Sequence, residues 1–152
     1  MSAEERVKEL GLDLSGGQTP LGAYVEAVQT GSLLFLTGML PIAGGKPAMV
    51  VRAGETVDVE RGRAAARVAA MNVLAVARKH LGSLDRVTRM VRLTAFLVGV
   101  VEAEQPKVAD GASELFRDVF GAERMSVRSV IGVASLPLGM PVELEVTMEV
   151  AD

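Results

Sequence analysis

The chain has 152 residues, 49% of them hydrophobic, a length and composition typical of one domain with a single core. It has no cysteine and one histidine, which excludes disulfides, thiolate nucleophiles and metal sites built from Cys or several His of one chain. The net charge of −3 and the lack of a basic stripe with aromatic residues argue against a nucleic-acid or membrane partner.

The first twenty residues are predicted to be an N-terminal extension of a single domain that spans residues 1–152. Residues 4–14, "EERVKELGLDL", predict a short helix with Val7, Leu10 and Leu14 on one face, ended by Gly11. The N-terminus is charged and lacks the apolar segment of a signal peptide. No apolar stretch reaches the roughly 18 residues that span a bilayer, so a cytoplasmic location is expected.

A strand hairpin is predicted at residues 24–38, "YVEAVQTGSLLFLTG", with its turn at residues 30–32. The second half, residues 33–36, is continuously apolar, which favours a central strand. The next segment, "PIAGGKP", is expected to be a loop, and residues 48–54, "AMVVRAG", are expected to form a third strand.

Two longer helices are predicted, at residues 57–81 and 105–120, with a strand between them at residues 86–100. The first helix is rich in Ala and ends before Gly82. Its apolar stripe is predicted to contain Ala65, Val68, Ala69, Asn72, Val73 and Val76. The inward face of the second helix is predicted to contain Val108, Ala112, Leu115, Phe116 and Val119.

The last two strands are predicted in "RSVIGVASLP", from Arg128, and "VELEVTMEV", from Val142. The second of these alternates strictly between apolar and polar residues, so one of its faces is polar. The order of elements predicts an α+β fold, a two-layer sandwich of a mixed β-sheet with two helices on one face. The uncovered face of that sheet must meet water or another subunit.

Few residues remain that could carry chemistry, because no phosphate-binding loop, G-x-S-x-G elbow or H-E-x-x-H motif occurs. Arg128 offers parallel N–H donors that suit a substrate carboxylate. Glu143 could orient or deprotonate a water, or pass a proton to a leaving nitrogen. Alternatively, these two side chains pair with each other across neighbouring strands, a contact worth about 0.2–1 kcal/mol.

The segment "VRSVIGVASLPLGMPVELEV" resembles the signature of the RidA/YjgF family, also called endoribonuclease L-PSP. The match consists of Arg128 and a small residue, an apolar stretch, Leu136-Pro137, a variable loop, and Val142-Glu143. "PLGAYVEAVQTGSLLFLTGMLPI" resembles the N-terminal block of the family, and "VADGASELFRDVFG" resembles its second helix. The chain departs from the family pattern at Val130, often Cys, and at Asp110-Gly111, often Asn, which implies a divergent subgroup.

The resemblance implies a chorismate-mutase-like fold that closes as a homotrimer, with ligand clefts between subunits. It also implies a hydrolase that needs no metal or organic cofactor. The implied activity is an enamine/imine deaminase that converts small imino acids derived from amino acids to 2-oxo acids and ammonia. Arg128 would hold the carboxylate of such a metabolite, helped by the backbone of Val130, and Glu143 would activate the attacking water.

Three further residues are implied to line the cleft. Tyr24 would come from a neighbouring subunit, and Thr37 and Gly38 would present hydroxyl and backbone groups to the imine end of the substrate. Two other functions stay open: a trimeric module that binds small carboxylates without catalysis, and a ribonuclease. The acidic balance opposes the ribonuclease, because phosphate contacts need clustered Lys and Arg.

Overall fold

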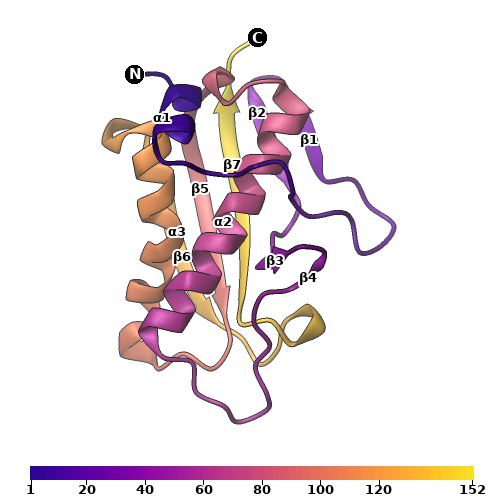
Figure 1. Cartoon of the computed structure of the whole chain (residues 1–152), viewed down its shortest axis with the longest axis vertical. Helices are drawn as coiled ribbons and strands as arrows, with labels where there is room; N and C mark the ends of the chain where they lie inside the picture. The colour runs from indigo at the N-terminus through magenta and orange to yellow at the C-terminus, as the bar shows by residue number, and fades with distance from the viewer.

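Five strands form one mixed sheet in the computed structural model of the protein, which describes residues 1–152 (Figure 1). Their order across the sheet is β1-β2-β7-β5-β6, and only β5 and β6 are parallel neighbours. The strands are β1 Ala27–Thr30, β2 Leu33–Leu36, β5 Val87–Leu97, β6 Val127–Gly132 and β7 Val142–Val150. The mixed sheet predicted from the order of elements is therefore confirmed.

Two helices, α2 (Val59–Leu81) and α3 (Gln105–Phe120), cover one face of this sheet. The Asp58 side chain accepts a hydrogen bond from the Arg61 backbone N–H and so caps the start of α2. Gly82 ends α2 in the left-handed conformation, with φ of 84°. Four 3₁₀ turns lie at Leu84–Arg86, Glu102–Glu104, Ala122–Arg124 and Pro137–Gly139.

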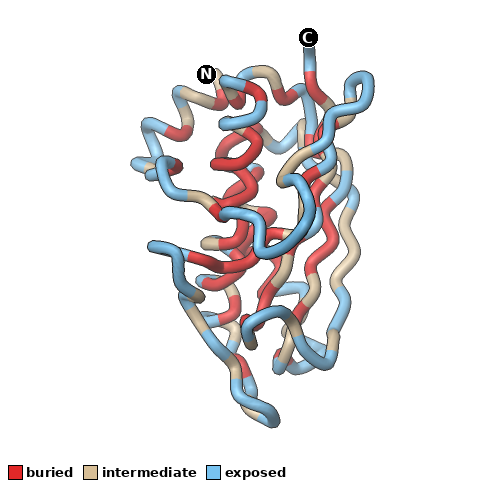
Figure 2. Tube along the Cα trace, turned by 90° about the vertical axis from the view of Figure 1, so that its right-hand side faces the viewer, coloured by how far each residue is buried: buried red, intermediate tan, exposed pale blue.

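The main core contains 36 buried residues and lies between the helices and the sheet (Figure 2). β7 contributes to this core by alternation: every second residue of the strand is buried beneath the helices. The predicted inward residues of α3 are all buried, and those of α2 are buried except for the partly exposed Val68. Asn72 is buried because its amide donates to the carbonyls of Leu40 and Ile42, at 2.8 and 2.9 Å.

The other face of the sheet has no helix over it. Glu143, Glu145, Thr147 and Glu149 of β7 point to this open face, as the alternation predicted. Phe35 of β2 also points there and is 43% exposed, although β2 lies inside the sheet. Val28 of β1, the register partner of Phe35, is exposed as well, and adjacent exposed apolar side chains on an uncovered sheet face are typical of a surface that another molecule covers.

The third strand predicted at residues 48–54 does not form. The chain instead makes a small hairpin of β3 (Ile42–Ala43) and β4 (Lys46–Pro47), within the segment expected to be a loop. Gly44 and Gly45 both have positive φ, 61° and 76°, which is the geometry of a two-residue hairpin turn. The apolar run at residues 48–54 has the composition of a strand, but the Gly-Gly pair before it is the stronger signal for a hairpin.

α2 and α3 approach each other closely at Gly111. A Cβ atom at this position would overlap the backbone carbonyl oxygen of Arg63 and lie 2.9 Å from the Arg63 Cα. Gly111→Ala is therefore expected to lower the free energy of unfolding by about 2–3 kcal/mol, because helix backbone must shift to make room. Urea unfolding would measure the change.

Gly16→Ala is the matched control for that substitution. An added Cβ at Gly16 has no atom within 4 Å and its φ is not positive, so a change within about 0.5 kcal/mol is expected. Equal stability of the Gly111→Ala and wild-type proteins would contradict the close approach of the two helices.

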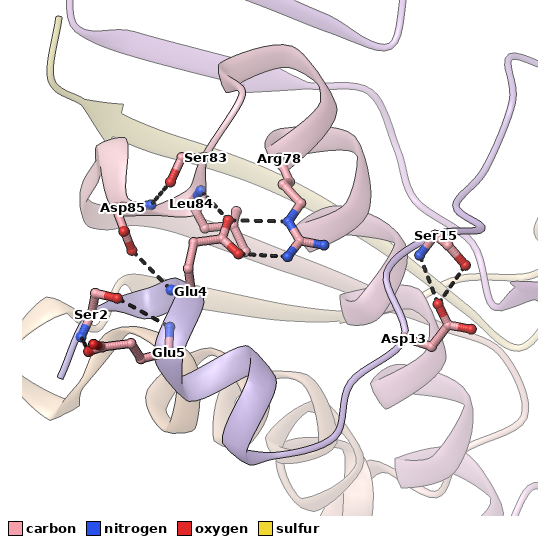
Figure 3. Close-up of polar contacts among 9 residues, drawn as sticks. All are labelled: Ser2, Glu4, Glu5, Asp13, Ser15, Arg78, Ser83, Leu84 and Asp85. Atoms are coloured by element: carbon pink, nitrogen blue, oxygen red, sulfur yellow. Dashed lines mark hydrogen bonds and ion pairs between the residues drawn. The ribbon is translucent and has the colours of Figure 1, made fainter.

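The N-terminal helix α1 (Ala3–Glu9) is fastened to the end of α2 by Glu4 (Figure 3). Arg78 donates to both carboxylate oxygens of Glu4, at 3.2 and 2.6 Å, and the Leu84 backbone N–H donates to one of them at 2.8 Å. Val7 of α1 is buried in the main core, whereas Leu10, predicted to share its face, is exposed. The helix ends before Leu10, one residue short of the expected stop at Gly11.

Glu4→Gln is expected to lower the free energy of unfolding by about 1–2 kcal/mol at neutral pH, because it removes a charge-assisted pair of hydrogen bonds. The hydrogen bond from Arg78 lowers the pKa of Glu4 below its ordinary value of 4.5. A lowered folded pKa means that this stabilisation is present above the unfolded pKa and is lost as the pH falls through the folded pKa. Urea unfolding at neutral pH and in acid should show the difference between the proteins shrink, whereas Glu9→Gln, at the exposed end of α1, should change neither value.

Candidate functional site

Arg128 lies on the edge strand β6 and points to the helix side of the sheet. Its register partner on β5 is Leu93, a fully buried core residue. The Nη1 atom of Arg128 donates to Asp110 Oδ1 at 2.6 Å and to Ser113 Oγ at 3.1 Å, both on α3. The arginine side chain is 25% exposed, so it is held against the helix and not splayed into solvent.

Glu143 lies at the start of β7 on the open face of the sheet, next to Gly38. Met39 and Leu144 exchange two backbone hydrogen bonds of 2.8 Å in an antiparallel bridge, which holds the Gly38 segment beside the start of β7. A Cβ on Gly38 would lie 2.9 Å from the carboxylate carbon of Glu143, so a side chain here would force that carboxylate to move. Burial, and then the nearby Glu145, raises the pKa of Glu143 above its ordinary value.

Arg128 and Glu143 do not pair with each other. β5 separates their strands, and the register partner of Glu143 is Phe96, three residues from Leu93, the partner of Arg128. Because side chains alternate across a strand, the two charged residues point to opposite faces of the sheet. The alternative of a cross-strand ion pair is therefore wrong, and Asp110 is the ionic partner of Arg128.

The other predicted residues divide between the central strand β7, the edge strand β6 and the edge near β1. Thr37 precedes Gly38, and its backbone N–H donates to the backbone carbonyl oxygen of Glu26 at 2.9 Å, while Gly38 lies against the Glu143 carboxylate. Val130 lies two residues after Arg128 on β6, opposite Ala95 of β5, and its side chain packs against the core. One chain thus brings together Thr37, Gly38 and Glu143, and separately Arg128 and Val130.

Tyr24 lies just before β1, at the edge of the sheet opposite β6 (Figure 1). It is 44% exposed, and its hydroxyl accepts a hydrogen bond of 2.8 Å from the Leu21 backbone N–H. It lines a hollow of about 520 Å³ with Lys79 and His80 of α2. The structure therefore separates Tyr24 from Arg128 of the same chain by the width of the sheet.

A polar cavity of about 270 Å³ lies beside Arg128, between α3 and the start of β6. Its lining is Asp110, Ser113, Glu114, Arg117, Met125, Ser126 and Arg128. Asp110 and Ser113 were not predicted as site residues. The sequence pattern that could have identified them is a polar stripe at helical spacing. It consists of Asp110, Ser113 and Arg117 and lies on the side of α3 away from the apolar stripe.

No cluster of three or more His, Cys, Asp or Glu side chains has an arrangement that could hold a metal ion. None of the helices combines the length and apolar character that a membrane span requires.

Comparison with known proteins assigns the chain to a family. Residues 4–145 match the family model described as YjgF/chorismate mutase-like, putative endoribonuclease. The chain is 37% identical over 145 residues to Protein TCP17 of Trypanosoma cruzi, which covers 94% of this chain and 91% of that protein.

Solved structures agree with this assignment. A putative endoribonuclease from Shewanella oneidensis MR-1 is 30% identical and superposes with a TM-score of 0.90, covering 99% of this chain and all of that one. The protein Atu1372 from Agrobacterium tumefaciens, of unknown function, is 36% identical with a TM-score of 0.84, covering 98% of this chain and 92% of that one. The chain belongs to the YjgF/chorismate mutase-like family.

Proposed function

We propose that the protein is an enamine/imine deaminase that hydrolyses small imino acids derived from amino acids to 2-oxo acids and ammonia. The observation that carries this proposal is the carboxylate of Glu143, which is partly buried, has a raised pKa and lies against Gly38. A carboxylate with a raised pKa is a stronger base than an ordinary one, so it takes a proton from water more readily.

The chemistry needs one water and no other reactant. Glu143 takes a proton from the water while the oxygen of that water bonds to the imine carbon, which leaves a tetrahedral carbon bearing nitrogen and oxygen. Glu143 then returns the proton to the nitrogen. The hydroxyl then gives its remaining proton through Glu143 to the nitrogen as the carbonyl forms and the carbon–nitrogen bond breaks, so ammonia leaves with both protons of the water. Arg128 holds the substrate carboxylate during both steps.

The cleft proposed for this reaction lies between copies of the chain in a homotrimer. Arg128 and Glu143 of one chain point to opposite faces of the sheet, so they cannot act on the same small molecule. The edge with Arg128 would instead meet the Tyr24 edge and Glu143 of a neighbour. The open sheet face with Phe35 provides a surface for this assembly. Light scattering should give three times the chain mass of 16.0 kDa.

A second candidate function, carboxylate binding without turnover, is favoured by one observation. Asp110 already neutralises part of the Arg128 charge, which weakens the binding of a simple anion by Arg128. Ribonuclease activity, named for relatives in the family, has less support because the net charge is −3.

The test is the rate at which 2-oxobutyrate and ammonia appear from freshly generated 2-iminobutyrate. The wild-type protein is expected to exceed both the uncatalysed rate and the rate with Arg128→Ala. Release of product at the uncatalysed rate would refute the deaminase. Calorimetric binding of 2-oxobutyrate by such an inactive protein would then favour the binding module.

A further inference from the structure

The ion pair between Arg128 and Asp110 leaves hydrogen-bonding groups of both side chains without a partner. Nη1 of Arg128 donates to Asp110 Oδ1 and to Ser113 Oγ. Nη2 and Nε of Arg128, and Oδ2 of Asp110, make no hydrogen bond within the chain. A guanidinium has five N–H donors and a carboxylate accepts on both oxygens, so each partner has capacity for a ligand.

Both side chains are open to an incoming molecule. They line the polar cavity between α3 and β6, with the Asp110 side chain 45% exposed and that of Arg128 25% exposed. The other acid in this cavity, Glu114, is already paired with Arg63. Asp110 is therefore the one carboxylate of the cavity that shares Arg128 and still has a free oxygen.

A plain carboxylate is a poor match for this arrangement. It gains the N–H donors of Arg128 but approaches the negative charge of Asp110, which is bound to the same guanidinium at 2.6 Å. A ligand with a cationic N–H next to its carboxylate is a better match. Its carboxylate meets Nη2 and Nε of Arg128, while its nitrogen donates to Oδ2 of Asp110.

We propose that Asp110 is a specificity-determining residue that makes the cleft select carboxylates with a protonated nitrogen on the neighbouring carbon. This inference rests on the proposed function, in which Arg128 holds the substrate carboxylate. A protonated imino acid has the required pair of groups, and its 2-oxo acid product does not. Asp110 thereby favours substrate over product, and it stabilises the protonated imine, the form that water attacks most readily.

The test is calorimetric binding of two stable probes with the same carbon skeleton, L-2-aminobutyrate and 2-oxobutyrate. The wild-type protein is expected to prefer the amino acid by about tenfold. Asp110→Asn keeps an acceptor for Arg128 but removes the charge. It is expected to weaken binding of L-2-aminobutyrate and strengthen that of 2-oxobutyrate, so that the preference is lost or reversed.

Two control variants separate this effect from general damage. Glu60→Gln makes a matched carboxylate-to-amide change at an exposed position of the neighbouring helix α2, outside the cavity, and it should leave both affinities unchanged. Ser113→Ala removes the uncharged partner of Arg128 Nη1, so it should weaken both probes by the same factor. Thermal unfolding would establish that each variant is folded.

The outcomes distinguish this inference from the proposed function. If Asp110→Asn changes both affinities by one factor, or changes neither, Asp110 does not determine specificity, although carboxylate binding stands. If the wild-type protein binds neither probe while Arg128→Ala behaves identically, the role of Arg128 fails, and the inference fails with it. An opposite shift of the two affinities supports both.

Discussion

Co-expression of Arg128→Ala and Glu143→Gln chains is expected to restore about a quarter of the wild-type deaminase rate, although each variant alone is inactive. The expectation follows from the opposite faces on which one chain presents these residues. If each cleft takes Arg128 from one chain and Glu143 from its neighbour, random mixing gives about a quarter of the clefts both native residues. The rate of ammonia release from the whole co-expressed mixture of trimers, without separation of the mixed ones, would measure this.

The control pairs Arg128→Ala with the double variant that lacks both residues. No cleft in that mixture contains Arg128, so activity should stay at the uncatalysed rate. Mixed trimers of the two single variants that form but remain inactive would show that the residues do not meet across a subunit boundary. The shared cleft would then be wrong, whatever activity the wild-type protein has.

Glu143→Gln is expected to lower kcat by about 10²–10⁴-fold while making the protein more stable at neutral pH. The amide is nearly the same size as the carboxylate but cannot take a proton from water. Stability rises because burial and the neighbouring Glu145 disfavour the charge of Glu143, as the raised pKa indicates. Paired measurements of ammonia release and thermal unfolding would test both parts, and a variant that loses stability would contradict the unfavourable charge.

The pH dependence follows from the same raised pKa. The folded protein holds the Glu143 proton to higher pH than the unfolded chain, whose value is near 4.5. The stability cost of the charge is therefore absent below the unfolded pKa and complete above the folded pKa. The wild-type protein and Glu143→Gln should have the same unfolding midpoint below this interval, differ increasingly as the pH rises through it, and keep the full difference above it. The kcat/KM of the wild-type protein should rise over the same interval.

Glu145→Gln is the matched control on the same strand and the same face. Glu145 raises the pKa of Glu143, so its neutralisation should move the pH profile of kcat/KM to lower pH without a large loss of rate. An unchanged profile would mean that another group gives rise to the pH dependence.

The sequence predicts the layers of this fold well because periodicity reports burial directly. The alternation of β7 and the apolar stripe of α3 both follow from which side of the element meets the core. The hairpin of β3 and β4 was missed because two-residue strands are too short to have a period, and only the Gly44-Gly45 turn marked it.

The candidate site was less predictable, because it depends on which strands are neighbours. Spacing along the chain placed Arg128 and Glu143 at matching ends of consecutive strands, but β5 inserts between those strands and alternation turns the residues to opposite faces. The partner of Arg128, Asp110, lies eighteen residues earlier on a different element. Only the crossing of α3 over β6 shows that they meet.

The close approach of α2 and α3 also has a consequence for ligand affinity. Gly111 lets the backbone of α3 rest on the carbonyl of Arg63, and Asp110 is the adjacent residue on that rigid helix. The Asp110 side chain is held in place by the packed helices and by Arg128, so it loses little conformational entropy when a ligand binds. Most of the entropy lost on binding should therefore come from the small molecule itself, so stiffened analogues should gain affinity more readily than variants that tighten the protein.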